Sequence, residues 1–90
     1  MPAPRKTKPT RTRPMPELAR IGERFAARRI ELRLTQQILA DLAGVSRSTV
    51  QALEYGTGSV KLASVADIAE VLGLRLAITT TDVTATGPSQ

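Results

Sequence analysis

Apolar residues recur at helical spacing through most of the chain. Between residues 17 and 34 they stand 3, 4 and 7 positions apart, which predicts one amphipathic helix with Leu18, Ile21, Phe25 and Leu32 on its inner stripe. Three further helices are predicted at 36–43, 47–55 and 62–72. After Gly73 the period changes to 2, because apolar residues then alternate with others, which predicts a half-buried strand.

This pattern predicts an all-α fold of four to five helices that ends in a β-strand. We expect a domain at 17–73, a strand at 74–81 and a short polar tail at 82–90. A lone strand has two unpaired edges, and the chain offers no second strand. A two-fold partner would supply one, so Leu74, Leu76 and Ile78 are predicted at a homodimer interface. The alternative is an irregular tail laid over the helices.

The segment TQQILADLAGVSRSTVQALEYG, from Thr35 to Gly56, has the layout of a helix-turn-helix motif. Gly44 suits the left-handed residue that ends a helix, Val45 is an apolar plug, and Ser46 can cap the next helix. That second helix begins with hydrogen-bonding groups, as expected of a helix whose N-terminal end enters the major groove. We therefore predict that Arg47, Ser48 and Gln51 contact bases. The alternative is an ordinary helical hairpin with a solvated face.

Arg29 interrupts the apolar stripe of the first helix, where an unpaired charge would cost several kcal/mol. Glu54 lies on the inward face of the third helix, so the two residues are predicted to form a structural ion pair. The alternative is that both side chains extend to water.

The net charge of +5 is concentrated at the N-terminus. Residues 1–16 contain no acid and 5 of the 6 prolines, and their five cations are Arg5, Lys6, Lys8, Arg11 and Arg13. The remaining residues carry 8 basic and 8 acidic groups. We expect 1–16 to be a disordered arm that contacts DNA phosphates, or otherwise a solubilising extension.

The composition argues against catalysis. The chain contains no histidine and no cysteine, so the commonest general base, the commonest metal ligand and any disulfide are absent. We expect no enzymatic activity, cofactor or metal. No run of 18 apolar residues occurs, and no apolar stretch follows the basic N-terminus as in a secretory signal. A cytoplasmic, nucleoid-associated location is expected.

Residues from about 18 to 78 resemble the Cro/repressor-type, or XRE-like, helix-turn-helix family with its lambda-repressor-like fold. The segment from Thr35 to Gly56 carries the motif, with RRIELRLTQ before it and LASVADIAEVLGL after it. The resemblance implies that the Arg–Glu pair of the family falls on Arg29 and Glu54. It places base contacts at Arg47, Ser48 and Ala52, with Gln51 beside them, and a phosphate contact at Gln36. We expect Thr35 and Tyr55 also to contact phosphates.

The sequence departs from the family pattern at three positions. Arg33 stands at a frequent glycine, Ile38 replaces the acid or amide of a capping box, and Lys61 replaces the cap of the last helix. We expect Arg33 to adopt a left-handed conformation. Ile38 is predicted to be a half-covered surface residue or else a partner contact.

A narrower resemblance, based on VLGLRLAITT and the compact length, is to HipB-like antitoxins. It implies a repressor of its own operon that dimerises through the strand and binds a HipA-like kinase toxin. From the sequence we therefore expect a DNA-binding repressor of an inverted-repeat operator, acting as such an antitoxin. The alternatives are a stand-alone XRE-type or phage-type regulator without a toxin, and a protein-interaction adaptor.

Overall fold

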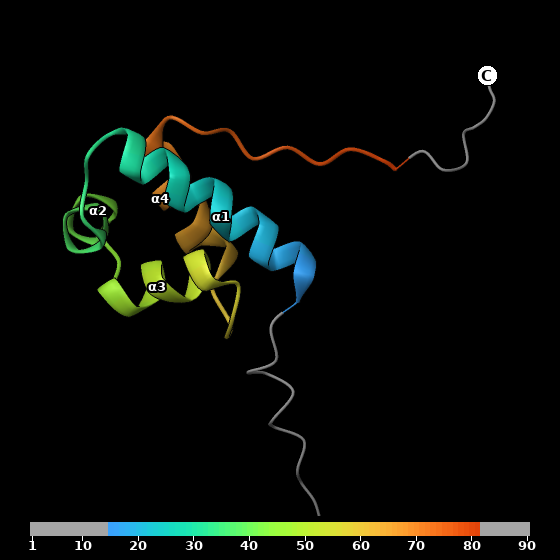
Figure 1. Cartoon of the computed structure of the whole chain (residues 1–90), viewed down its shortest axis with the longest axis horizontal. Coiled ribbons are helices and arrows are strands. Elements are labelled where there is room, and N and C mark those ends of the chain that lie inside the picture. The colour runs from blue at the N-terminus through green and yellow to red at the C-terminus, as the bar shows by residue number, and fades with distance from the viewer. Residues whose placement is uncertain (1–14, 82–90) are drawn as a thin grey trace, which may run out of the picture.

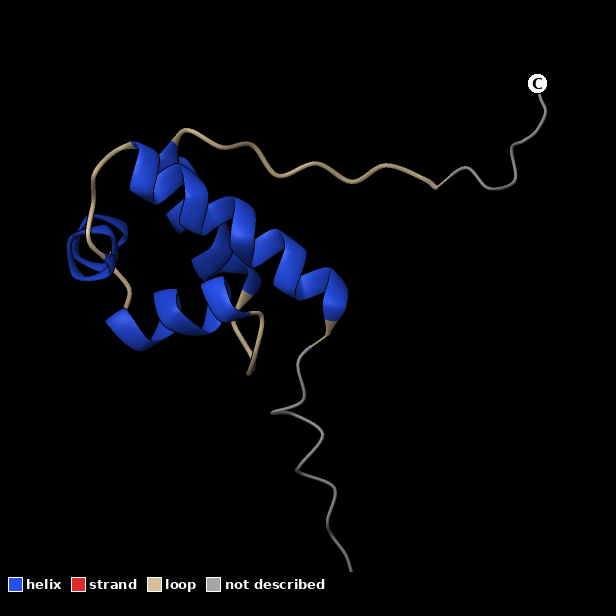
Figure 2. Cartoon of the chain, in the orientation of Figure 1, coloured by secondary structure: helices blue, strands red, loops and turns tan. Residues whose placement is uncertain are grey.

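The computed structural model describes residues 15–81, which form four α-helices (Figures 1 and 2). These are α1 (Pro16–Glu31), α2 (Gln36–Ala43), α3 (Arg47–Tyr55) and α4 (Leu62–Leu72). α1 packs chiefly against α3, and α2 packs against α3 and α4. The predicted helical architecture is confirmed, although the first helix, predicted over 17–34, runs from Pro16 to Glu31.

Local sequence signals account for the helix ends. Thr35 Oγ1 accepts a hydrogen bond from the Ile38 amide at 3.0 Å, which caps α2. Gly44, Gly56 and Gly73, all in the left-handed conformation, end α2, α3 and α4. Arg33, in the turn after α1, has φ 60° as expected for a position where the family often has glycine. Arg33 therefore adopts a backbone conformation that residues with a side chain rarely adopt.

The core is aliphatic apart from one phenylalanine. Its buried members come from all four helices and are Phe25, Leu39, Ala40, Val50, Leu53, Ile68, Ala69 and Leu72. Arg28, in the last turn of α1, links the C-terminal ends of α1 and α4, because its Nε donates a hydrogen bond to the Leu72 carbonyl at 2.8 Å. This bond satisfies a carbonyl at the C-terminus of α4 and places a cation at the negative end of the helix dipole.

The predicted inner stripe of the first helix is only partly correct. Phe25 is buried, but Leu18, Ile21 and Leu32 each remain at least 40% exposed. Helical periodicity shows that these residues share a face, and no element of residues 15–81 covers that face fully. The first half of α1 therefore leaves apolar surface in contact with solvent.

The strand predicted at 74–81 does not form within the described chain. Residues 74–81 instead run as an extended segment past α1 (Figures 1 and 2), and we refer to them as the C-terminal segment. A strand needs a hydrogen-bonded neighbour, and residues 15–81 contain no other extended segment that pairs with it. Residues 1–14, with all five cations of the predicted arm, and the tail 82–90 lie outside the described residues.

Candidate nucleic-acid interface

A tight turn joins α2 to α3. Gly44 has φ 73°, and the amide of Val45 donates to the Ala40 carbonyl at 3.0 Å, which closes the end of α2. Val45 packs against the core cluster. Because the turn is anchored by both a hydrogen bond and an apolar contact, α2 holds the N-terminal end of α3 in one orientation.

Ser46 organises the first turn of α3. Its Oγ accepts a hydrogen bond from the Thr49 amide at 3.1 Å and also lies 3.0 Å from the Ser48 hydroxyl. The hydroxyl of Thr49 is 2.8 Å from the same oxygen. Ser48, a predicted base contact, is thus exposed but already hydrogen-bonded to the cap, and it must keep or exchange this bond on DNA.

The other predicted base contacts, Arg47, Gln51 and Ala52, differ in exposure. Arg47 is exposed, and it takes part in neither of the two ion pairs within residues 15–81. Gln51 and Ala52 are half-buried, and Tyr55 is exposed at the other end of the helix. Because Arg47 stands at the start of α3 without an acidic partner, its guanidinium is free to bond with a base edge or a phosphate.

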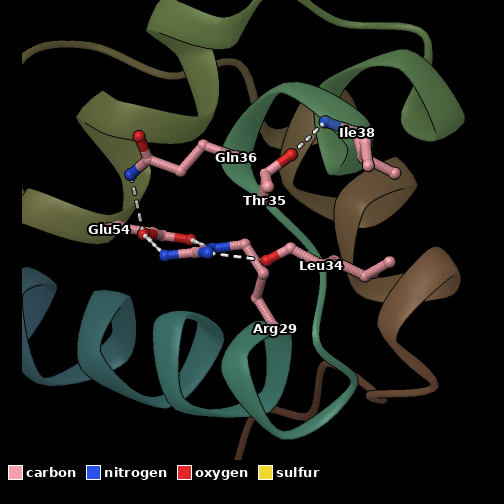
Figure 3. A network of polar contacts seen from close by, with 6 residues as sticks. All are labelled: Arg29, Leu34, Thr35, Gln36, Ile38 and Glu54. Atoms are coloured by element: carbon pink, nitrogen blue, oxygen red, sulfur yellow. Dashed lines mark hydrogen bonds and ion pairs between the residues drawn. The ribbon is translucent and has the colours of Figure 1, made fainter.

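A buried carboxylate holds α3 in the domain (Figure 3). Glu54 Oε2 accepts from Arg29 Nε at 2.7 Å, and Oε1 accepts from Arg29 Nη2 at 3.1 Å. The side chains of Arg29 and Glu54 are 14% and 4% exposed. The structure thus brings these two residues together in a bidentate, largely desolvated pair. Arg29 Nη1 also donates to the Leu34 carbonyl at 2.8 Å, which ties the α1–α2 turn to the same group.

Gln36 joins this network, a contact that the sequence did not predict. Its Nε2 donates to Glu54 Oε1 at 2.9 Å, so the first residue of α2 is bonded to the last turn of α3 (Figure 3). The resemblance placed a phosphate contact at Gln36. Since an amide nitrogen has two N–H groups, one remains for such a contact. Thr35 is exposed beside it, although its hydroxyl already caps α2.

A polar cleft of about 450 Å³ beside α3 was also missed by sequence reasoning. Hydroxyl groups and one cation dominate its wall, which includes Ser46, Ser48, Ser59, Lys61 and Ser64. Lys61 occupies the cap position of α4 without a side-chain cap. The first amides of α4 therefore stay available to an anion, and an exposed lysine lies next to them. The missing side-chain cap at Lys61 was the sequence signal for these open amides.

Two other classes of site find no support in residues 15–81. These residues contain no group of three or more histidine, cysteine, aspartate or glutamate side chains able to hold a metal ion. None of their helices has the length and apolarity needed to cross a membrane.

Comparison with known proteins identifies the motif. A family model described as "Helix-turn-helix" matches residues 25–78. The chain is also similar to the restriction-modification controller protein C.AhdI from Aeromonas hydrophila. The two share 31% identity with a TM-score of 0.63, over 68% of this chain and 92% of C.AhdI. No curated protein sequence matches the chain. The chain belongs to the helix-turn-helix family, and it is a DNA-binding regulator of the XRE type.

Proposed function

We propose that the protein is a transcription repressor that binds an inverted-repeat operator as a homodimer and controls genes at its own locus. The observation that carries this proposal is the exposed N-terminal end of α3, with Arg47 unpaired and the helix held at its other end by Glu54. A rigidly held helix with free hydrogen-bonding groups at its start suits contact with base edges. The similarity to a restriction-modification controller supports a role in controlling a linked set of genes.

The antitoxin role with a HipA-like toxin stays a prediction from the sequence. It depended on the compact length and on a strand at 74–81, which does not form within the described chain. The similar structure is a controller protein, so we propose a regulator of that kind. Co-purification of the chain with a kinase-like protein encoded beside it would instead favour the antitoxin.

Footprinting on the DNA upstream of the protein's own gene tests the proposal. We expect two protected half-sites related by two-fold symmetry, with centres about 34 Å apart or a multiple of that distance. A gel shift with the same DNA should show a complex that persists over an excess of unrelated duplex. Binding that is equal on both DNAs would contradict sequence-specific regulation, and absence of binding would favour a protein-interaction adaptor.

Arg47→Ala is expected to weaken operator binding by about 1–3 kcal/mol and to relax the preference at one base pair in each half-site. Arginine can donate two parallel hydrogen bonds to guanine O6 and N7, and alanine can donate none. Lys61→Ala is the matched control. If Lys61 contacts a phosphate, its loss should weaken binding to operator and to random DNA alike. Titrations of both variants with both DNAs separate the two effects. If Arg47→Ala also lowers both affinities equally, Arg47 contacts phosphate.

Deletion of residues 1–14 should flatten the salt dependence of DNA binding. Each of the five cations that contacts a phosphate contributes about 0.9 to the slope of log K against log salt. The deletion stops before Met15 because Pro16 begins α1. Affinity for operator and random duplex should fall together. An unchanged slope would leave the arm as a solubilising extension, and a loss limited to one A·T-rich position would indicate minor-groove contact instead.

A further inference from the structure

An apolar groove of about 670 Å³ lies between the first half of α1, the C-terminal half of α3, the α3–α4 loop, the start of α4 and the C-terminal segment. Its walls include Leu18, Ile21, Leu53, Val60, Leu62 and Leu76, and no charged residue is among those that line it. The groove offers no cation that could bind a DNA phosphate. The groove therefore suits an uncharged, apolar occupant.

Several apolar residues around this groove are poorly covered. Leu62 is 76% exposed and Ile78 is 99% exposed, although both belong to the groove wall. Leu18 and Ile21, two of the three residues of the predicted inner stripe that remain exposed, lie on the same wall. The unfilled side of α1 and the unpacked side of the C-terminal segment thus face one common space.

The C-terminal segment also lacks backbone partners. The Leu74 amide donates to the Ala69 carbonyl at 2.9 Å, and no backbone hydrogen bond within residues 15–81 involves the segment beyond it. Its alternating apolar residues and open N–H and C=O groups form a strand edge that can pair with a second strand.

The rest of the chain cannot supply the occupant. Residues 1–14 carry five cations and four prolines, and residues 82–90 contain only one large apolar residue, Val83. A second copy offers both an apolar alternating segment and an open strand edge. One surface then complements itself, which is the condition for a closed two-fold dimer.

We infer that the groove is the dimer interface, filled by the C-terminal segment of a second copy. The two segments pair as an antiparallel ribbon, and the ribbon's apolar face, which carries Leu76 and Ile78, covers both grooves. Ala52, Leu53 and Gly56, in the C-terminal half of α3, line the groove, so the predicted base contact at Ala52 borders it. The opposite end of α3, with Arg47, stays free for DNA. This inference rests on the proposed homodimer and assigns its surface.

Sedimentation equilibrium of Leu62→Glu tests this assignment. Leu62 lies outside the C-terminal segment and is exposed in the single chain, so the variant should fold while placing a charge in each of two buried grooves. We expect the dimer dissociation constant to rise about 100-fold or more. Ile30→Glu is the matched control, since Ile30 is also more than half exposed but lies outside the groove, and it should dimerise like the parent. Leu76→Asp should dissociate the dimer as Leu62→Glu does.

Three results would overturn the assignment. They are a parent protein that stays monomeric at tens of micromolar, a Leu62→Glu variant as dimeric as the parent, and an Ile30→Glu variant that dissociates equally. Increased association after removal of residues 82–90 would show that the chain's own tail fills the groove. Should Leu62→Glu lose its helical circular dichroism, Leu62→Gln replaces it with the same expected direction.

A single half-site duplex separates this inference from the proposed function. The Leu62→Glu monomer should bind one half-site as well as the parent does, while its affinity for the two-site operator falls towards the half-site value. Failure of the parent to prefer the half-site over random duplex would contradict the proposed DNA recognition and leave the dimer interface intact.

Discussion

Glu54→Gln is expected to lower the free energy of unfolding by about 3–5 kcal/mol. The substitution keeps the shape of the side chain but removes the charge that compensates the Arg29 guanidinium, which is only 14% exposed. For a domain of this size, each kcal/mol corresponds to a decrease of about 4–8 °C in melting temperature. Thermal and urea denaturation followed by circular dichroism would measure the loss. We also expect weaker DNA binding, because the same carboxylate holds α3 against α1 and α2 (Figure 3).

The chain offers a matched control for this prediction in its second ion pair. Arg28 Nη1 and Glu31 Oε1 lie 3.1 Å apart, but the two side chains are 38% and 68% exposed. Water already solvates both charges, so Glu31→Gln should change stability by less than about 1 kcal/mol. If Glu54→Gln melts within a degree or two of the parent, the pair is solvated in solution and does not organise the domain.

Gly22→Ala is expected to destabilise the protein by about 3 kcal/mol or more, although alanine is the better helix former. A methyl group at this position would lie 2.3 Å from the Leu53 carbonyl oxygen and 2.5 Å from that of Glu54. Both atoms belong to the backbone of α3, so α1 and α3 can relieve the clash only by moving apart. That movement would also stretch the Arg29–Glu54 pair. Chemical denaturation gives the free-energy difference.

Gly44→Ala serves as the comparison for this second prediction. A methyl group at Gly44 meets no atom within 4 Å, so the cost comes only from its φ of 73°. We expect about 1–2 kcal/mol, less than for Gly22→Ala. Equal or reversed losses would show that α1 and α3 tolerate separation, and that their close crossing does not limit stability.

The ion pair illustrates how much of the site the sequence could indicate. An arginine on an apolar stripe requires a carboxylate, and Glu54 on the inward face of α3 was the candidate. Gln36 gave no comparable signal, because the side chain of a glutamine at the start of a helix can hydrogen-bond to water as well as to the protein. Its bond to Glu54 depends on how α2 crosses α3. The close approach of α1 to α3 at Gly22 was not predicted for the same reason, since a glycine within a helix does not show which backbone lies against it.

The sequence by itself determined the boundaries of α2, α3 and α4, the caps at Thr35 and Ser46, the left-handed residues and the turn that makes the motif, because these depend on interactions between residues a few positions apart. Only the tertiary structure decided which apolar faces are covered. Leu18 and Ile21 share a stripe with Phe25, yet they border an open groove. The C-terminal segment has the alternation of a strand but no neighbour within the described chain. Periodicity places residues on a face of their own element, whereas burial and strand pairing require a second surface, which distant residues or another copy must supply.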